Sequence, residues 1–130
     1  MISYGVYKIV HYFGVFLLVT ALSATLGRAA AGPAGEAEGR PAADPWKRRL
    51  AMVHGVALFL VLLGGFGMLA RLGVDHGAIF PGWIWAKLAI WVGLAALVSA
   101  RRTRVWAARA LVLVPLLAVL AAVVAYTKPF

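Results

Sequence analysis

The sequence predicts an all-α fold, a transmembrane four-helix bundle. Of its 130 residues, 64% are hydrophobic, a larger apolar share than a soluble domain has. The mean hydropathy is +0.92. Four nearly uncharged runs, at 9–27, 50–70, 77–100 and 110–127, are each long enough to cross a hydrocarbon core of about 30 Å as a helix. No alternating pattern typical of barrel strands competes with them. We therefore expect a single membrane domain, 1–130.

The first two expected helices are 4–27 and 48–71. The connection between them, 28–46, is rich in Ala, Gly and Pro, which predicts a flexible segment with little structure of its own. Trp46 and the following "KRR" favour the headgroup zone at the start of the second helix. Near its end, the glycines of "GGFG" allow either another helix or a flat ligand to approach its backbone.

The other two expected helices are 81–100 and 106–127. Pro81 suits the first turn of a helix, because its missing N–H has no partner there. The segment "RRTR" predicts a short turn, after which the apolar run resumes to the end of the fourth helix.

The basic residues predict how the bundle is oriented. The formal charge is +9, and nine of the thirteen Lys and Arg residues lie in or beside the first and third connections (Arg28, Arg40, Lys47, Arg48, Arg49, Arg101, Arg102, Arg104, Arg109). The positive-inside rule makes these connections cytoplasmic and places both termini outside, in a multi-pass protein of the cell inner (cytoplasmic) membrane. The basic excess thus reflects the topology in a lipid bilayer, with contact to anionic lipid as a weaker alternative, and no nucleic-acid partner is expected.

The residue inventory limits any metal site to histidines. There is no cysteine, which excludes thiolate ligands and covalent haem attachment. The acidic residues all lie in connections, which argues against a carboxylate metal site inside the membrane (Glu36, Glu38, Asp44, Asp75). The remaining candidates are His11, His54 and His76.

A depth count groups two of the polar residues. Measured from the basic boundary at about 1.5 Å per residue, His11 lies about 25 Å deep and Lys87 about 21 Å deep. By the same rise His54 lies roughly 8 Å deep, too far from His11 to share one iron. We therefore expect His11 and Lys87 to face one cavity.

The neighbours of this pair suit a planar ligand. Gly14, one turn after His11, leaves room for a macrocycle, and Trp91 on the stripe of Lys87 provides an aromatic wall. Such a wall equally suits cation–π shielding of the ammonium. Each residue also has an alternative interpretation. For Lys87 it is a side chain that reaches outward to the headgroups, and for His11 it is a ring that donates to a backbone carbonyl. His54 is either structural or a second metal site.

Four separate stretches resemble one family. "YKIVHYFGVFLLVTAL", "WKRRLAMVHGVALFLVLLGGFG", "GWIWAKLAIW" and the ending "VVAYTKPF" are similar, in that order, to segments of the HemJ-type protoporphyrinogen IX oxidases. The first helix departs from the family pattern in ending "SATLGRAAAG", and the histidine at 54 is not part of that pattern. The chain would thus be a divergent member.

The resemblance implies a function and a site. His11 matches the haem-ligand histidine of the family, and Lys87 matches its essential lysine. The implied activity is the oxidation of protoporphyrinogen IX to protoporphyrin IX in haem biosynthesis, with bound haem b and electrons passed toward the respiratory chain. The porphyrinogen is then the substrate, and Lys87 is the catalytic residue.

A second hypothesis is non-enzymatic. The chain is short, and small residues suited to helix packing occur in its helices. These features also fit an accessory, assembly or electron-transfer subunit of a larger membrane complex, or a homo-oligomer.

Overall fold

The computed structural model describes residues 2–32, 45–73 and 80–128, and it confirms an all-α bundle. Its elements are α1 (Tyr4–Ala31), α2 (Pro45–Arg71), α3 (Gly82–Leu97), the 3-10 helix η1 (Val98–Arg102) and α4 (Arg104–Thr127). With η1 continuing α3, the described chain has four helices long and apolar enough to cross a membrane. The protein is therefore a multi-pass membrane protein.

The helix ends follow local capping chemistry. α1 continues past 27 through its alanines to Ala31 and ends at Gly32, whose φ of 76° lies in the left-handed region that glycine adopts without strain. α2 already begins at Pro45, because proline is favoured at the first helical position. The connection expected at 28–46 is thus too long at both ends, and 33–44 lie outside the described residues.

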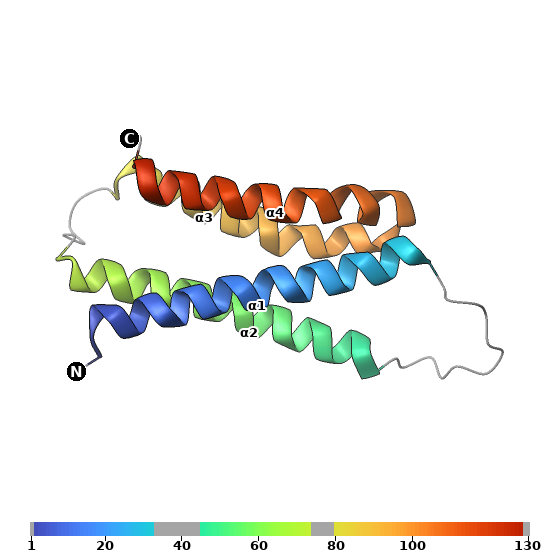
Figure 1. The fold of residues 1–130 in the computed structure, drawn as a ribbon, viewed down its shortest axis with the longest axis horizontal. Coiled ribbons are helices and arrows are strands. Elements are labelled where there is room, and N and C mark those ends of the chain that lie inside the picture. The colour runs from blue at the N-terminus through green and yellow to red at the C-terminus, as the bar shows by residue number, and fades with distance from the viewer. Residues whose placement is uncertain (1, 33–44, 74–79, 129–130) are drawn as a thin grey trace.

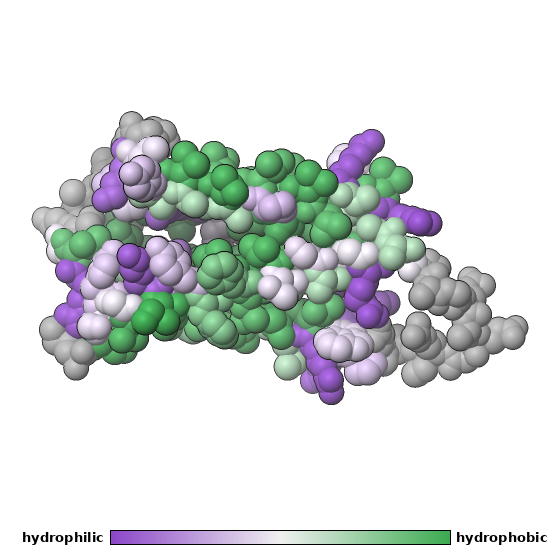
Figure 2. All heavy atoms as spheres, viewed as in Figure 1, coloured by the Kyte–Doolittle hydropathy of each residue, from purple (hydrophilic) through white to green (hydrophobic). Residues whose placement is uncertain are grey.

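The outside of the bundle is apolar. Phe16 is 73% exposed, Ile9 69% and Phe59 62%, although large apolar side chains are normally covered in a soluble protein. Figure 2 shows these apolar side chains as a broad band between two more polar ends. This surface fits contact with lipid hydrocarbon.

The four helices run along one axis, and both chain ends lie at the same end of the bundle (Figure 1). α1 packs against α2 and α4, and α3 packs against α4. We call the end of the bundle that holds Ser3 and Lys128 the terminal end. The opposite end, which holds Arg28 and Arg102, is the basic end.

At the basic end, α1 joins α4 through a tight apolar core. Leu22 and Leu26 of α1 are fully buried among small or β-branched residues of α4 (Ala107, Ala110, Val114). In addition, the Arg104 side chain donates from Nε to the backbone oxygen of Ala30 at 2.8 Å. This bond satisfies a carbonyl that the end of α1 leaves without an intrahelical partner. The core and the bond fasten the two helices where η1 turns the chain.

At the terminal end, α1 instead crosses α2 at glycines. A Cβ atom added at Gly64 would lie 2.6 Å from the backbone nitrogen of His11, and one added at Gly14 would lie 2.9 Å from the backbone nitrogen of Val61. Gly67 likewise leaves space for the Tyr7 ring. Of the "GGFG" glycines, Gly64 and Gly67 thus serve the approach of a helix, whereas Gly65 lines the cavity described below.

We expect the variant Gly64→Ala to destabilise the bundle, because its methyl group meets the backbone of α1, which cannot rotate away. Overpacking of this kind typically costs about 1–3 kcal/mol. Thermal unfolding of the purified protein in detergent micelles measures the effect. Gly55→Ala is the matched control on the same helix, since nothing lies within 4 Å of a Cβ added there. Equal melting temperatures for the two variants would contradict the close crossing.

Candidate functional site

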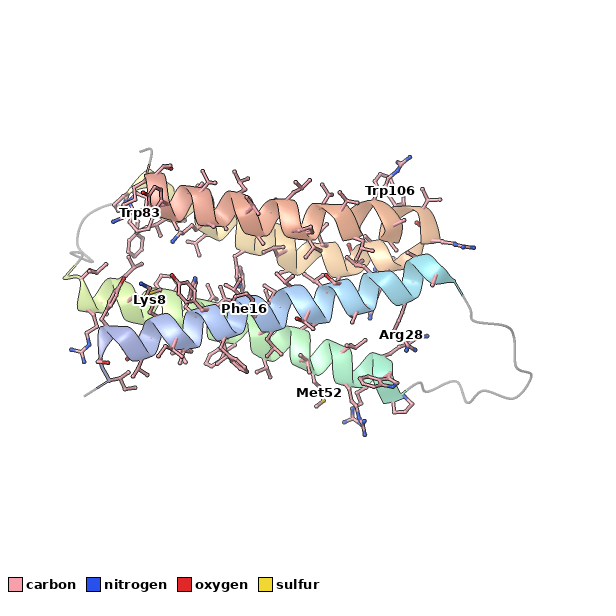
Figure 3. The ribbon with its side chains drawn as sticks, viewed as in Figure 1. Lys8, Phe16, Arg28, Met52, Trp83 and Trp106 are labelled. Carbon is pink, nitrogen blue, oxygen red and sulfur yellow. The ribbon has the colours of Figure 1, made fainter. Side chains whose placement is uncertain are left out.

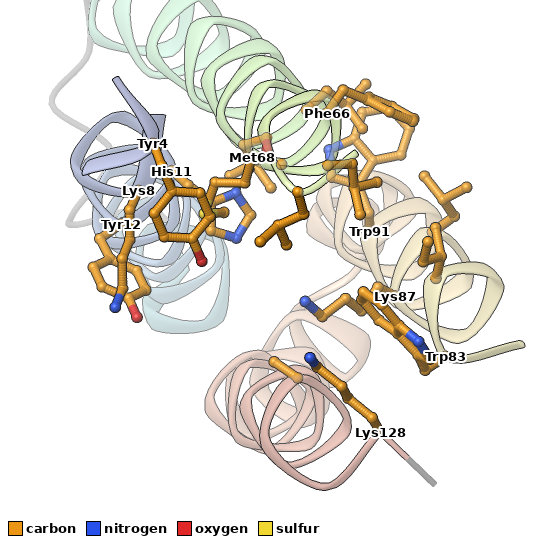
Figure 4. Close-up of a pocket in the computed structure, with 18 residues that line it drawn as sticks. Tyr4, Lys8, His11, Tyr12, Phe66, Met68, Trp83, Lys87, Trp91 and Lys128 are labelled. Atoms are coloured by element: carbon orange, nitrogen blue, oxygen red, sulfur yellow. Dashed lines mark hydrogen bonds between the residues drawn. The ribbon is translucent and has the colours of Figure 1, made fainter. Parts of the chain in front are cut away.

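A cavity of about 350 Å³ lies at the terminal end of the bundle. It is bounded by two helix pairs, α1 with α2 and α3 with α4. All four helices line it, and it contains His11 of α1, Lys87 and Trp91 of α3, and Lys128 at the end of α4. Figure 4 looks down the bundle and shows these side chains converging from α1 on one side and α3 and α4 on the other. Figure 2 shows the surface hollowed between α1 and α4 near this end. The expectation that His11 and Lys87 line one cavity is confirmed.

The His11 ring is held by the neighbouring helix. Its Nδ1 atom lies 2.8 Å from the backbone oxygen of Val61. Because a carbonyl oxygen only accepts, Nδ1 carries the hydrogen, and neutral His11 has its lone pair on Nε2. The hydrogen bond to Val61 engages Nδ1 and leaves Nε2 out of that contact. The ring is thus fixed through one nitrogen, while the other remains available to a ligand. The interpretation that His11 donates to a backbone carbonyl is correct, and it is compatible with a ligand role.

Lysines line the cavity from facing walls. The Lys87 Nζ atom lies 5.2 Å from the Trp83 ring centroid, and the Lys128 Nζ atom lies 5.6 Å from the same centroid. On the α1 side, Lys8 Nζ lies 5.8 Å from the centroid of Tyr12. Lys87 is half-buried, whereas Lys8 and Lys128 are exposed, so the cation–π contact replaces lost hydration mainly at Lys87.

No acidic residue lines this cavity within the described chain, and the three lysines form no ion pair there. Figure 3 places Lys8 and Trp83 at the terminal end and Arg28 and Trp106 at the basic end. The cavity is therefore a positively charged site with aromatic and aliphatic walls, chemistry that suits an anionic amphipathic ligand.

Trp91 connects α3 to α2. Its indole Nε1–H donates to the backbone oxygen of Leu58 at 3.2 Å, and the ring lines the cavity. A buried indole N–H needs such an acceptor, so the bond fixes the orientation of the ring. Trp91 therefore forms a wall of the cavity, as its position on the helical stripe of Lys87 predicted.

Gly14 does not line the cavity. It is buried against Leu60 and Val61 of α2, and these residues occupy the space expected to be open to a macrocycle. The expectation is wrong because the lack of a side chain at Gly14 serves helix packing. The space for a ligand arises instead where α1 and α4 separate.

His54 lies outside the cavity. It is 8% exposed, its ring interacts with the backbone of Ala95, and its buried Nδ1 has no hydrogen-bond partner in the described part of the chain. His76 falls outside the described residues. Within the described ranges, no group of three or more His, Cys, Asp or Glu side chains is placed to hold a metal ion. A metal site in the cavity would rest on His11.

Sequence reasoning missed two of the lysines. Lys8 precedes His11 by one helical turn, and that spacing is a signal that the two share a face. Lys128 carried no such signal, because its direction depends on how the backbone ends α4. Neither lysine belongs to the basic connections that the sequence analysis singles out, whereas the structure brings both to the cavity.

The fold and cavity define a class: a small multi-pass membrane protein with a cationic, aromatic-walled cavity at one end of its bundle. Comparisons with protein-family models, with curated proteins and with solved structures find no match for this chain. Membership of the HemJ-type family therefore stays a prediction based on the sequence motifs.

Proposed function

We propose that the protein binds haem b in the cavity and oxidises protoporphyrinogen IX, as its motifs imply. The observation that carries the proposal is the His11 ring. The Nδ1–H donates to a carbonyl, and this second bond is the usual way in which proteins orient a metal-binding imidazole and raise its basicity. Nε2 is then the nitrogen that would bind iron.

The rest of the cavity also suits a tetrapyrrole. Trp91 and the aliphatic residues beside it offer flat apolar contact, and the lysines offer partners for propionate groups. A volume of about 350 Å³ is within the range of small-molecule sites, and the cavity is open on one side, so a larger ring can extend from it. No carboxylate among the described lining residues repels an anionic ligand.

The residues of the chain have separate roles in this proposal. Haem, when bound, supplies an acceptor and relay for electrons. Lys87 faces His11 across the cavity, where its amine pairs with a propionate of the tetrapyrrole or takes up protons released as the porphyrinogen ring is oxidised. The walls around Trp91 exclude water from the reacting ring.

The orientation in the membrane is part of the same proposal. The basic end faces the cytoplasm, and the terminal end, with the cavity, faces outward across the inner membrane. The support is the charge distribution, because the cations of the third connection all lie at the basic end (Figure 1).

A haem spectrum tests the ligand assignment. We expect purified wild-type protein to show the Soret band of a b-type haem and His11→Ala to lose it, because Nε2 of His11 is the only imidazole nitrogen that the described cavity offers. His54→Ala is the control, since His54 lies outside the cavity, and it should keep the band. A band that survives in His11→Ala and disappears in His54→Ala would move the haem to the second site.

A turnover assay tests the catalytic assignment. We expect Lys87→Ala to abolish oxidation of protoporphyrinogen IX, followed by porphyrin fluorescence, while His11 still holds the haem and the Soret band persists. Unchanged turnover would reject a catalytic role for Lys87. A wild-type protein that has the Soret band but no turnover would favour the accessory or electron-transfer subunit.

Cysteine labelling tests the orientation. The chain has no cysteine, so Ile2→Cys and Arg102→Cys each create a single reporter at one end of the bundle. In intact spheroplasts, a membrane-impermeant maleimide should label the variant at position 2 at once and the variant at position 102 only after lysis. The reverse pattern would show that the basic end faces outward.

A further inference from the structure

The end of α4 has an unusual backbone for its residue type. Lys128 has φ 43° and ψ 58°, the left-handed conformation, and its N–H donates to the Val124 oxygen at 3.1 Å. This capping position favours glycine, because a side chain there crowds the neighbouring carbonyl. Lys128 is the only non-glycine residue with positive φ in the described chain. Capping alone therefore does not explain the lysine.

The strained backbone directs the ammonium group back to the cavity. The Lys128 side chain reaches the Trp83 ring, which Lys87 also contacts, and the two ammonium groups repel each other. Figure 4 shows both side chains extending from one wall in the same direction. The described chain offers no carboxylate to offset the repulsion. Two like charges on one indole, with no carboxylate beside them among the described residues, favour an anion as their partner.

We infer that Lys87 and Lys128 together bind the carboxylate edge of the ligand, so that the cavity selects a tetrapyrrole with free propionates. The inference rests on the proposed function and adds to it a specificity element. Lys128 contributes a second ammonium group to the carboxylate site, in addition to the one that Lys87 supplies.

The positions of His11 and the two lysines favour a rigid ligand over a lipid. His11 belongs to α1, whereas the lysines belong to α3 and the end of α4, across the cavity. A ligand that reaches both walls needs a stiff apolar body with its anionic groups on one edge. A lipid headgroup phosphate shares the anionic chemistry, but its flexible chains provide no such body.

The experiment compares haemin with haemin dimethyl ester, which lacks the free carboxylates. Both are titrated into wild-type protein and Lys128→Gly in a non-ionic detergent. Glycine suits the capping conformation, so thermal unfolding should show this variant to be at least as stable as wild type. We expect haemin to bind Lys128→Gly roughly tenfold more weakly than wild type, the effect of about one hydrogen bond to a charged group. The ester should bind both proteins equally, and Lys128→Arg should restore haemin affinity.

Several outcomes would overturn the inference. Equal haemin affinity in wild type and Lys128→Gly would show that Lys128 does not bind the ligand, and the assignment of His11 as the haem ligand would be unaffected. Equal weakening of haemin and ester would show a general packing effect. If Lys128→Gly loses only bound phosphatidylglycerol, added as the lipid probe, the lysines serve a headgroup. Failure of wild-type protein to bind either haemin probe would overturn the proposed function together with this inference.

Discussion

The contact between the backbones of α1 and α2 at Gly64 is the constraint on which the site depends. In lipid, apolar helices gain little by burying apolar surface, so their association relies on close van der Waals contact and hydrogen bonds. The glycine lets the backbone of His11 approach α2, and the approach brings the ring to the Val61 carbonyl. One small residue therefore contributes to helix association and also fixes the orientation of the imidazole.

The cavity follows from how the two helix pairs are joined. Leucines of α1 and small residues of α4 bring the pairs together at the basic end, and the glycines tie α1 to α2 at the other end. Because α1 stays close to α2 at the terminal end, α1 separates from α4 (Figure 1). The cavity opens between α1 and α4. On another side of the cavity, Trp91 of α3 connects the two helix pairs by its bond to Leu58 of α2. The opening is thus a consequence of packing elsewhere in the bundle.

The sequence was sufficient to predict the four helices and the positions of the polar residues along them, because hydropathy and the helical rise determine both. It did not determine how each helix is rotated about its axis. α1 is apolar on every side, so no amphipathic pattern shows which stripe meets α2. Gly14 was consequently assigned to the wrong surroundings although His11 was placed correctly. The role of Lys128 depends on a single backbone conformation at a helix end, for which the sequence held no signal.

The terminal end combines features that do not favour stability. A cavity forfeits dispersion contacts, cations in a partly apolar site lose hydration, and a lysine occupies a conformation suited to glycine. The basic end shows the opposite design, with fully buried leucines and valine. Local conflicts of this kind concentrate at functional sites, where the rest of the fold compensates for them. A ligand that fills the cavity and neutralises the lysines would relieve the lost contacts and the repulsion together, so occupancy and stability of this end are coupled.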